Sequence, residues 1–105
     1  ELRMATRDGK GGFEGTALDL LVSEGKSDEA PLYACGPRGM LVGVAQRLDM
    51  AAMNRAQISV EERMACGVGA CRGCAVPAAG PGEAYATACR EGPVFFAGEI
   101  DWGRF

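Results

Sequence analysis

Apolar and polar side chains alternate at the start of the chain and then recur at helical spacing. Residues 2–7 alternate, which predicts a short strand followed by a glycine-rich turn. Thr16 stands where a helix N-cap is expected, and Gly25 stands where that helix should end. The apolar residues between them have helical spacing: Leu18, Leu21 and Val22. The first part of the chain is therefore predicted to be a strand followed by a helix.

A strand–helix–strand pattern covers the next part of the chain. The apolar run at residues 31–35 predicts a buried strand, and residues 57–62 predict another. Between them, an apolar stripe predicts one helix over residues 38–53: Met40, Leu41, Val44, Ala45, Leu48 and Ala52. A polar connection at residues 27–30 joins this pattern to the first helix. The order β-α-β-α-β predicts the α/β class with a partly parallel sheet.

Helical periodicity disappears after Glu62, where glycine, alanine and cysteine dominate to about Gly82. Large apolar residues return only near the end: Val94, Phe95, Phe96 and Ile100. Such a small, loop-rich segment builds little core of its own, so something else has to organise it, and a metal cluster would do so. We therefore predict two domains, residues 1–62 and residues 63–105, without internal repeats.

The composition removes several classes of function. The chain has 105 residues and a net charge of −3 with mixed signs, whereas a nucleic-acid binder would show a basic patch. No apolar run is long enough to cross a membrane. The absence of histidine excludes Cys₂His₂ zinc sites, Rieske clusters and histidine acid–base catalysis. The chain begins at Glu1 without an initiator methionine, so we expect it to be a piece of a longer protein.

The cysteines carry the clearest chemical signal. There are five, an odd number that suits a disulfide scaffold poorly. Cys66, Cys71 and Cys74 have the C-x4-C-x2-C spacing of plant-type [2Fe–2S] ferredoxins, and Cys89 follows after fourteen intervening residues. Glycines inside the motif permit unusual dihedral angles and amide contacts to cluster sulfurs: Gly67, Gly69 and Gly73. We predict a [2Fe–2S] cluster bound by these four cysteines, in the cytoplasm, where thiols stay reduced.

Three other kinds of site compete for the same cysteines. A structural zinc site usually pairs two C-x2-C knuckles, and only Cys71–Cys74 has that spacing. This pair alone could be a redox dithiol, but thioredoxin-like motifs follow a strand and open a helix, and here Cys66 and glycines crowd the pair. The C-x2-C-x2-C run of bacterial [4Fe–4S] sites is absent. The spacing therefore favours the [2Fe–2S] cluster.

A second candidate site lies at Cys35, Gly36 and Pro37, between a predicted strand and a predicted helix. Ligands of open α/β sheets bind at such positions, and a helix start favours anions. No GxGxxG or Walker loop accompanies these residues, so on the spacing alone a tight connection is the simpler interpretation. We expect Cys35 to be a free thiol and not a cluster ligand, because four other cysteines are available.

Three segments of the chain resemble a known family: YACGPRGML, ISVEERMACGVGACRGCAV and CREGPVFFAGEIDW. Over nearly its whole length the chain resembles the electron-transfer subunit of class B dihydroorotate dehydrogenase, within the ferredoxin–NADP reductase superfamily. The resemblance implies that residues 1–62 are the C-terminal half of an NAD-binding domain, without its first half and without the FAD-binding barrel, and that residues 63–105 are the [2Fe–2S] domain. It also implies that Cys35, Gly36 and Pro37 lie on the nicotinamide side. For Cys35 in this piece of the subunit, a small buried apolar residue is the preferred interpretation.

The resemblance implies a function as well. The cluster would relay electrons from the FMN of the catalytic dihydroorotate dehydrogenase subunit to FAD, which then reduces NAD⁺ in pyrimidine biosynthesis. The alternative is an electron-transfer subunit of a related NADH-dependent ferredoxin–NADP reductase or of a sulfide dehydrogenase, and a zinc-stabilised interaction module is a third hypothesis. We expect this flavoprotein-related piece to work within an oxidoreductase complex without turnover of its own, and without nucleic-acid or membrane partners. We also expect the cluster loop to lie near the surface.

Overall fold

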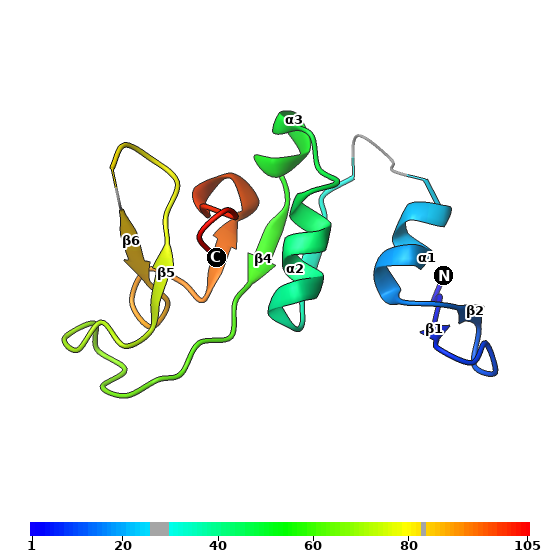
Figure 1. Ribbon diagram of the computed structural model, residues 1–105, viewed down its shortest axis with the longest axis horizontal. Helices are drawn as coiled ribbons and strands as arrows, with labels where there is room; N and C mark the ends of the chain where they lie inside the picture. The colour runs from blue at the N-terminus through cyan, green and yellow to red at the C-terminus, as the bar shows by residue number, and fades with distance from the viewer. Residues whose placement is uncertain (26–29, 83) are drawn as a thin grey trace. The chain divides into compact units, whose positions relative to one another are not determined.

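The computed structural model describes residues 1–25, 30–82 and 84–105. The chain forms two compact units, Glu1–Ala30 and Pro31–Phe105. Helices alternate with small parallel and antiparallel sheets, which confirms the predicted α/β class (Figure 1). No helix among the described residues has the length and apolar character needed to cross a membrane. The predicted polar connection at residues 27–30 lies, except for Ala30, outside the described residues.

The first unit holds a two-stranded sheet and one helix. β1 (Ala5–Thr6) pairs parallel with β2 (Phe13–Glu14), and α1 (Ala17–Ser23) follows. β1 is shorter than the strand predicted over residues 2–7. None of the residues described in this unit is fully buried, so the unit has little core of its own.

The predicted start of α1 is confirmed. The Asp19 amide donates a hydrogen bond to the Thr16 hydroxyl at 3.1 Å, and the Thr16 amide donates one to the Asp19 carboxylate at 2.9 Å. This reciprocal capping box satisfies two amides at the helix start. At the other end, Glu24 is the C-cap and Gly25 follows in the left-handed region at φ +74°, where glycine is favoured.

The central sheet of the second unit has the strand order β3-β4-β7. β3 (Tyr33–Cys35) runs parallel to β4 (Gln57–Ser59), and α2 (Arg38–Ala45) lies between them in sequence. The partly parallel sheet is therefore present. β7 (Val94–Phe96) pairs antiparallel with the other edge of β4. The strand predicted first in the chain is not part of this sheet, because β1 pairs with β2 instead.

The helix predicted over residues 38–53 is divided into two. α2 ends at Ala45, and α3 (Met50–Met53) begins after Asp49, whose carboxylate accepts a hydrogen bond from the Ala52 amide at 2.7 Å. A capping aspartate offers the backbone an alternative to continuing the preceding helix. The prediction of one continuous helix was therefore wrong, because the apolar stripe does not show such a break.

An antiparallel hairpin lies between β4 and β7 in the sequence. β5 (Ala75–Pro77) pairs with β6 (Tyr85–Thr87), and a bridge between Ala78 and Ile100 ties the hairpin to the segment after β7. The short 3-10 helix η1 (Ala97–Glu99) separates β7 from that segment. The hairpin was not predicted, because each of its strands has only three residues.

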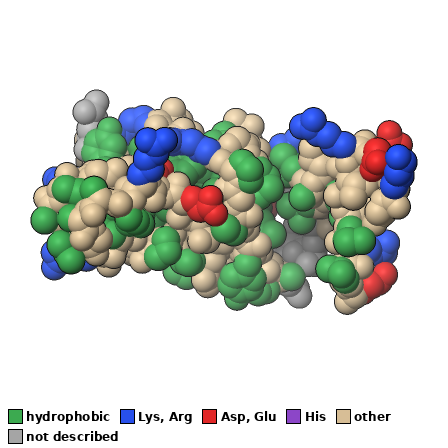
Figure 2. Space-filling model, turned by 90° about the horizontal axis from the view of Figure 1, so that it is seen from below, with side chains coloured by type: hydrophobic (Ala, Val, Ile, Leu, Met, Phe, Trp, Pro, Cys, Tyr) green, Lys and Arg blue, Asp and Glu red, His purple; other side chains and the backbone are tan. Residues whose placement is uncertain are grey.

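The core of the second unit gathers apolar side chains from α2, the central sheet and the hairpin. Ile58 at the centre of β4 is fully buried and lies directly opposite Phe95 on β7. Other buried apolar residues are Leu41, Val44, Ala45, Ala56, Val60, Val76, Ala88, Ala97 and Ile100. The neighbouring positions of the sheet, Tyr33, Val94 and Phe96, are exposed. Figure 2 shows hydrophobic side chains scattered over the face in view, among polar ones and backbone.

The division predicted at residue 62 concerns the domains of a longer protein, and it stays a prediction. In this structure one sheet takes β3 and β4 from the part before residue 62 and β7 from the part after it. The Val60 amide also donates a hydrogen bond to the Pro93 carbonyl at 3.0 Å. The central sheet therefore joins the two predicted parts.

Because Ile58 is fully enclosed by the central sheet, we expect Ile58→Ala to lower the free energy of unfolding by about 2–5 kcal/mol. Met50→Ala removes a side chain that is 75% exposed in the same unit, so its effect should stay within about 0.5 kcal/mol. Urea unfolding of both variants, followed by circular dichroism, measures the difference. Equal effects of the two substitutions would contradict the assignment of the core.

Candidate metal centre

The four predicted ligands lie on two segments that meet at the hairpin. Cys66 and Cys71 belong to the loop that leads from β4 to β5, and Cys74 directly precedes β5. Cys89 follows β6 by two residues. Cys66 and Cys71 are exposed, Cys89 is half-buried and Cys74 is buried. The loop lies at the surface, as expected, because Cys66, Cys71 and Arg72 are exposed.

Backbone amides of the loop converge on the first two sulfurs. Cys66 Sγ accepts hydrogen bonds from the amides of Val68 at 3.5 Å and Cys71 at 3.4 Å. Cys71 Sγ accepts one from the Gly73 amide at 3.3 Å. The Cys71 amide, followed by the Val68 amide and the Cys71 thiol, lowers the pKa of Cys66 to about 6. The loop therefore favours the thiolate, which is the form that binds metal.

The other two cysteines meet through the hairpin ladder. The Ala88 amide donates a hydrogen bond to the Cys74 carbonyl at 3.0 Å, which extends the β5–β6 pairing to the ligand positions. A hydrogen bond between the thiols of Cys89 and Cys74 raises the pKa of Cys89, and burial raises it further, while the Gly69 amide acts in the opposite direction. The two thiols are therefore close enough to share a hydrogen bond, so one cation could bind both sulfurs.

A carboxylate fixes the turn that carries Cys89. Glu91 accepts hydrogen bonds from the Thr87 amide and from the Thr87 hydroxyl, the latter at 2.9 Å. The Glu91 amide in turn donates to the Thr87 carbonyl at 2.8 Å. These contacts lower the pKa of Glu91, the Thr87 amide most of all, so the carboxylate stays ionised. This role of Glu91 could not be predicted from the sequence, because a carboxylate two residues from a cysteine has no characteristic spacing.

The sulfurs are arranged as two pairs, Cys66 with Cys71 and Cys74 with Cys89. Within the described part of the chain, no three His, Cys, Asp or Glu side chains are placed to hold one metal ion. A structural zinc site gathers four ligands around a single ion. A [2Fe–2S] cluster with four cysteines instead gives two ligands to each of two irons. Four thiolates without histidine are the ligand set that a [2Fe–2S] cluster takes.

The loop needs backbone conformations that few residues adopt. Gly67 and Gly69 have φ of +69° and +80°, as expected from the motif. Gly73 is not in the left-handed region, and Arg72 beside it is, with φ +55°. The prediction that Gly73 has an unusual backbone dihedral angle was therefore wrong. A Cβ at Gly73 would come 3.4 Å from Cys71 Sγ, so close approach is the reason for a glycine there.

The second candidate site lies at the end of β3. Cys35 is exposed, with its Sγ 4.0 Å from the Glu61 carboxylate, so the interpretation of Cys35 as a buried apolar residue is wrong. Within the unit Pro31–Phe105, Tyr33 and Val94 of the same sheet are exposed as well. Gly36 has φ +156°, and a Cβ there would lie 2.5 Å from Met40 Cε, so the turn requires glycine.

A cavity of about 350 Å³ separates this turn from the cysteine loop. Its lining includes Gly36 and Pro37 on one side and Gly73 on the other. Arg38 and Phe105 also line it, and the Arg38 guanidinium lies 4.3 Å from the centre of the Phe105 ring. The sequence did not indicate the part taken by Phe105, because nothing in the spacing links it to the start of α2.

Comparisons with known proteins agree with the geometry. Residues 61–101 match the family described as the iron–sulfur cluster binding domain of dihydroorotate dehydrogenase B. The chain is 42% identical over 100 residues to the "Dihydroorotate dehydrogenase B (NAD(+)), electron transfer subunit" of Geobacillus thermodenitrificans (strain NG80-2), covering 95% of this chain and 37% of that relative. It is 35% identical over 102 residues to the "Probable" subunit of the same name from Archaeoglobus fulgidus, covering 96% and 41%. The chain thus spans well under half the length of these curated relatives.

A solved structure shares the fold. It is that of the NADH-dependent reduced ferredoxin-NADP oxidoreductase, described in connection with flavin-based electron bifurcation. The match has a TM-score of 0.61 and 24% identity, and it covers 92% of this chain and 31% of that one. At this level of identity the likeness concerns the fold alone.

Two glycines of the loop provide a matched test of its geometry. Alanine at Gly67 or at Gly69 should cost about 1–2 kcal/mol of stability, because both have left-handed backbones. A Cβ at Gly67 meets open space, whereas at Gly69 it comes 3.1 Å from Arg90 Cδ, next to Cys89. We therefore expect Gly69→Ala to retain less iron than Gly67→Ala after anaerobic purification. Equal iron retention in the two variants would show that the contact with Arg90 is unimportant.

Proposed function

Because residues 61–101 match the iron–sulfur cluster binding domain of dihydroorotate dehydrogenase B, we propose that this chain serves as part of an electron transfer subunit of that enzyme. It carries a [2Fe–2S] cluster that relays electrons from the FMN of the catalytic subunit to FAD and on to NAD⁺, in pyrimidine biosynthesis. The observation that carries this proposal is the match of residues 61–101 to that domain, with all four cysteines inside the matched range.

Each cysteine has a definite part in holding the cluster. Cys66 and Cys71 bind one iron, and Cys74 and Cys89 bind the other. When bound, the cluster supplies one-electron transfer between redox partners. The amides of Val68, Cys71 and Gly73 donate to the sulfurs of the first pair and stabilise their negative charge. Such hydrogen bonds and the exposure of the site are the means by which a protein sets the reduction potential.

The first pair is placed to meet a partner. Cys66 and Cys71 are exposed, and two large apolar side chains beside them, Met64 and Val68, are 50% and 70% exposed. Little side-chain bulk covers the loop, so another redox centre can approach closely. We propose that this side meets a catalytic subunit that carries FMN. The relatives are named as electron transfer subunits, which supports a partner subunit. No nucleic acid or membrane takes part.

The turn at Cys35, Gly36 and Pro37 provides the nicotinamide side in this proposal. The supporting observation is the cavity between Gly36–Pro37 and Gly73, whose volume of about 350 Å³ lies in the range of small-ligand pockets. A nicotinamide or flavin ring held there would lie between the turn and the cluster loop. FAD itself belongs to the complete subunit, and NAD is the electron acceptor.

The related reductase and sulfide dehydrogenase subunits are less well supported. The likeness to the ferredoxin-NADP oxidoreductase structure is 24% identical and concerns the fold, whereas the matched domain and the curated relatives carry the dihydroorotate dehydrogenase name. We propose that the protein works in the cytoplasm, where reducing conditions keep cysteine thiols available to bind iron. We also propose that this chain alone does not oxidise dihydroorotate with NAD⁺, since it spans 37% of the length of such a relative.

Substitution of one ligand tests the function directly. Anaerobically purified protein should contain about two irons and two sulfides per chain. Cys71→Ser should lose the cluster and loosen residues 63–105, because metal binding and folding are coupled in segments with little core. Cys35→Ser is the matched control, since it changes another exposed cysteine, and it should keep the full iron content.

A colourless wild-type protein with zinc and no iron would overturn the proposal. Loss of the cluster in Cys35→Ser would overturn the ligand assignment, and Cys89 would then be the first ligand to doubt.

A further inference from the structure

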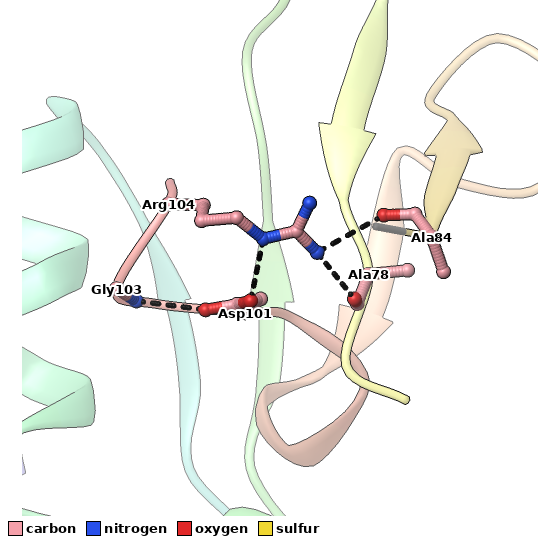
Figure 3. Close-up of polar contacts among 5 residues, drawn as sticks. All are labelled: Ala78, Ala84, Asp101, Gly103 and Arg104. Atoms are coloured by element: carbon pink, nitrogen blue, oxygen red, sulfur yellow. Dashed lines mark hydrogen bonds and ion pairs between the residues drawn. The ribbon is translucent and has the colours of Figure 1, made fainter. Parts of the chain in front are cut away.

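Arg104 joins the two strands of the β5–β6 hairpin from outside the hairpin (Figure 3). Its Nη2 donates hydrogen bonds to the carbonyl of Ala78 at 3.1 Å and to the carbonyl of Ala84 at 3.2 Å. These two residues follow β5 and precede β6, and the Ala78 amide itself donates to the Ala84 carbonyl at 3.0 Å. The Arg104 side chain therefore binds two residues that are paired with each other across the hairpin, Ala78 and Ala84.

The guanidinium is itself held in place. Its Nε donates to the Asp101 carboxylate at 2.6 Å, and the other oxygen of that carboxylate accepts from the Gly103 amide at 3.1 Å. The Asp101 amide donates to the Pro77 carbonyl at 3.0 Å, so the segment that carries Arg104 is attached to β5. The ring of Tyr85 on β6 lies 5.2 Å from the guanidinium carbon. Arg104 thus has contacts on both strands and a fixed carboxylate behind it.

The cysteines lie at the other end of this hairpin. The pairing runs from Ala78 and Ala84 through the three pairs of β5 and β6 to the contact between the Ala88 amide and the Cys74 carbonyl. Cys89 is the next residue after Ala88. The distance between Cys74 and Cys89 is therefore decided by the register of one short ladder.

Register is the property that such a short hairpin is least able to keep by itself. An isolated two-stranded hairpin is marginally stable in water, and a slip of one residue turns its side chains to the opposite faces. A slip would move one strand by about 3.3 Å along the other, so that Nη2 could no longer reach both carbonyls. Asp101 fixes the planar guanidinium of Arg104, so a slip would break at least one of the two hydrogen bonds from Nη2.

One feature of Arg104 is costly to the fold. Its Nη1 is buried and has no hydrogen-bond acceptor among the described residues. Buried donors without acceptors are rare and call for an explanation. The contacts of Nε with Asp101 and of Nη2 with the two opposed carbonyls fix the guanidinium and leave Nη1 without an acceptor there.

From these contacts we propose that Arg104 is a positioning residue for Cys74 and Cys89, the second ligand pair of the iron–sulfur site, and that it acts by fixing the register of the β5–β6 hairpin. This inference rests on the proposed function, because it assumes that these cysteines bind a cluster. Arg104 touches no cysteine, and its effect is transmitted along the ladder.

The test compares three variants of the cluster-loaded complete protein. Arg104→Met keeps the aliphatic stem and removes the fork, and Asp101→Asn keeps Arg104 but removes the carboxylate that fixes it. Arg47→Met is the matched control, because among the described residues the Arg47 side chain donates to the Gly43 carbonyl of the preceding helix α2, at 2.8 Å. The measurements are the rate of iron loss to a chelator and the electron paramagnetic resonance spectrum of the reduced protein, both taken below the unfolding midpoint of each variant.

We expect Arg104→Met to lose iron about 10-fold faster than the wild type and to show an altered or heterogeneous resonance spectrum. Asp101→Asn should change the rate of iron loss and the resonance spectrum in the same direction by a smaller amount. Arg47→Met should match the wild type in both measurements. If Arg104→Met unfolds at the assay temperature, Asp101→Asn decides by the same two readouts.

A lower unfolding midpoint with an unchanged spectrum and an unchanged rate of iron loss would show a purely structural role and overturn the inference alone. A wild-type protein that takes up no iron would overturn the proposed function, and this inference with it.

Discussion

The antiparallel pairing of β4 with β7 is the contact on which the cysteine site depends. The Val60 amide reaches the Pro93 carbonyl, and Ile58 lies opposite Phe95 in the buried core. All four candidate ligands lie between Val60 and Pro93, so this pairing closes the loop that contains them. Closing a long loop costs conformational entropy, and the burial of Ile58 and Phe95 offsets that cost. Inside the closed loop, the hairpin brings Cys74 and Cys89 together, and local amides hold Cys66 and Cys71.

The site could be predicted further from the sequence than the fold could. The spacing of Cys66, Cys71 and Cys74 indicates ferredoxin-type chemistry, because a loop wrapped around a small cluster needs ligands at fixed short intervals. The start of α1 could also be predicted from the sequence, since a capping box is made by two side chains close in sequence. Both features are local. A pattern in the sequence is most informative where the atoms that interact are only a few residues apart.

The features that were missed depend on distant residues. The β5–β6 hairpin has three pairs of residues and takes support from Arg104 and Ile100, which follow it by many positions. The exposed position of Cys35 depends on which segments cover the central sheet, and an apolar run alone suggested burial. The break between α2 and α3 was missed for a different reason: Asp49 is local, but it also fits the polar face of a continuous helix.

The central claim of this account is that the four cysteines hold two irons as two pairs. Mössbauer spectroscopy of the anaerobically purified protein tests it most directly, because this method counts iron sites and separates their oxidation states. We expect the oxidised protein to contain only ferric iron, with overlapping signals from its two irons, and the protein reduced by one electron to show one ferric and one ferrous site in equal amounts. A single iron site in the reduced protein, or no iron signal from a protein that contains zinc, would contradict this assignment.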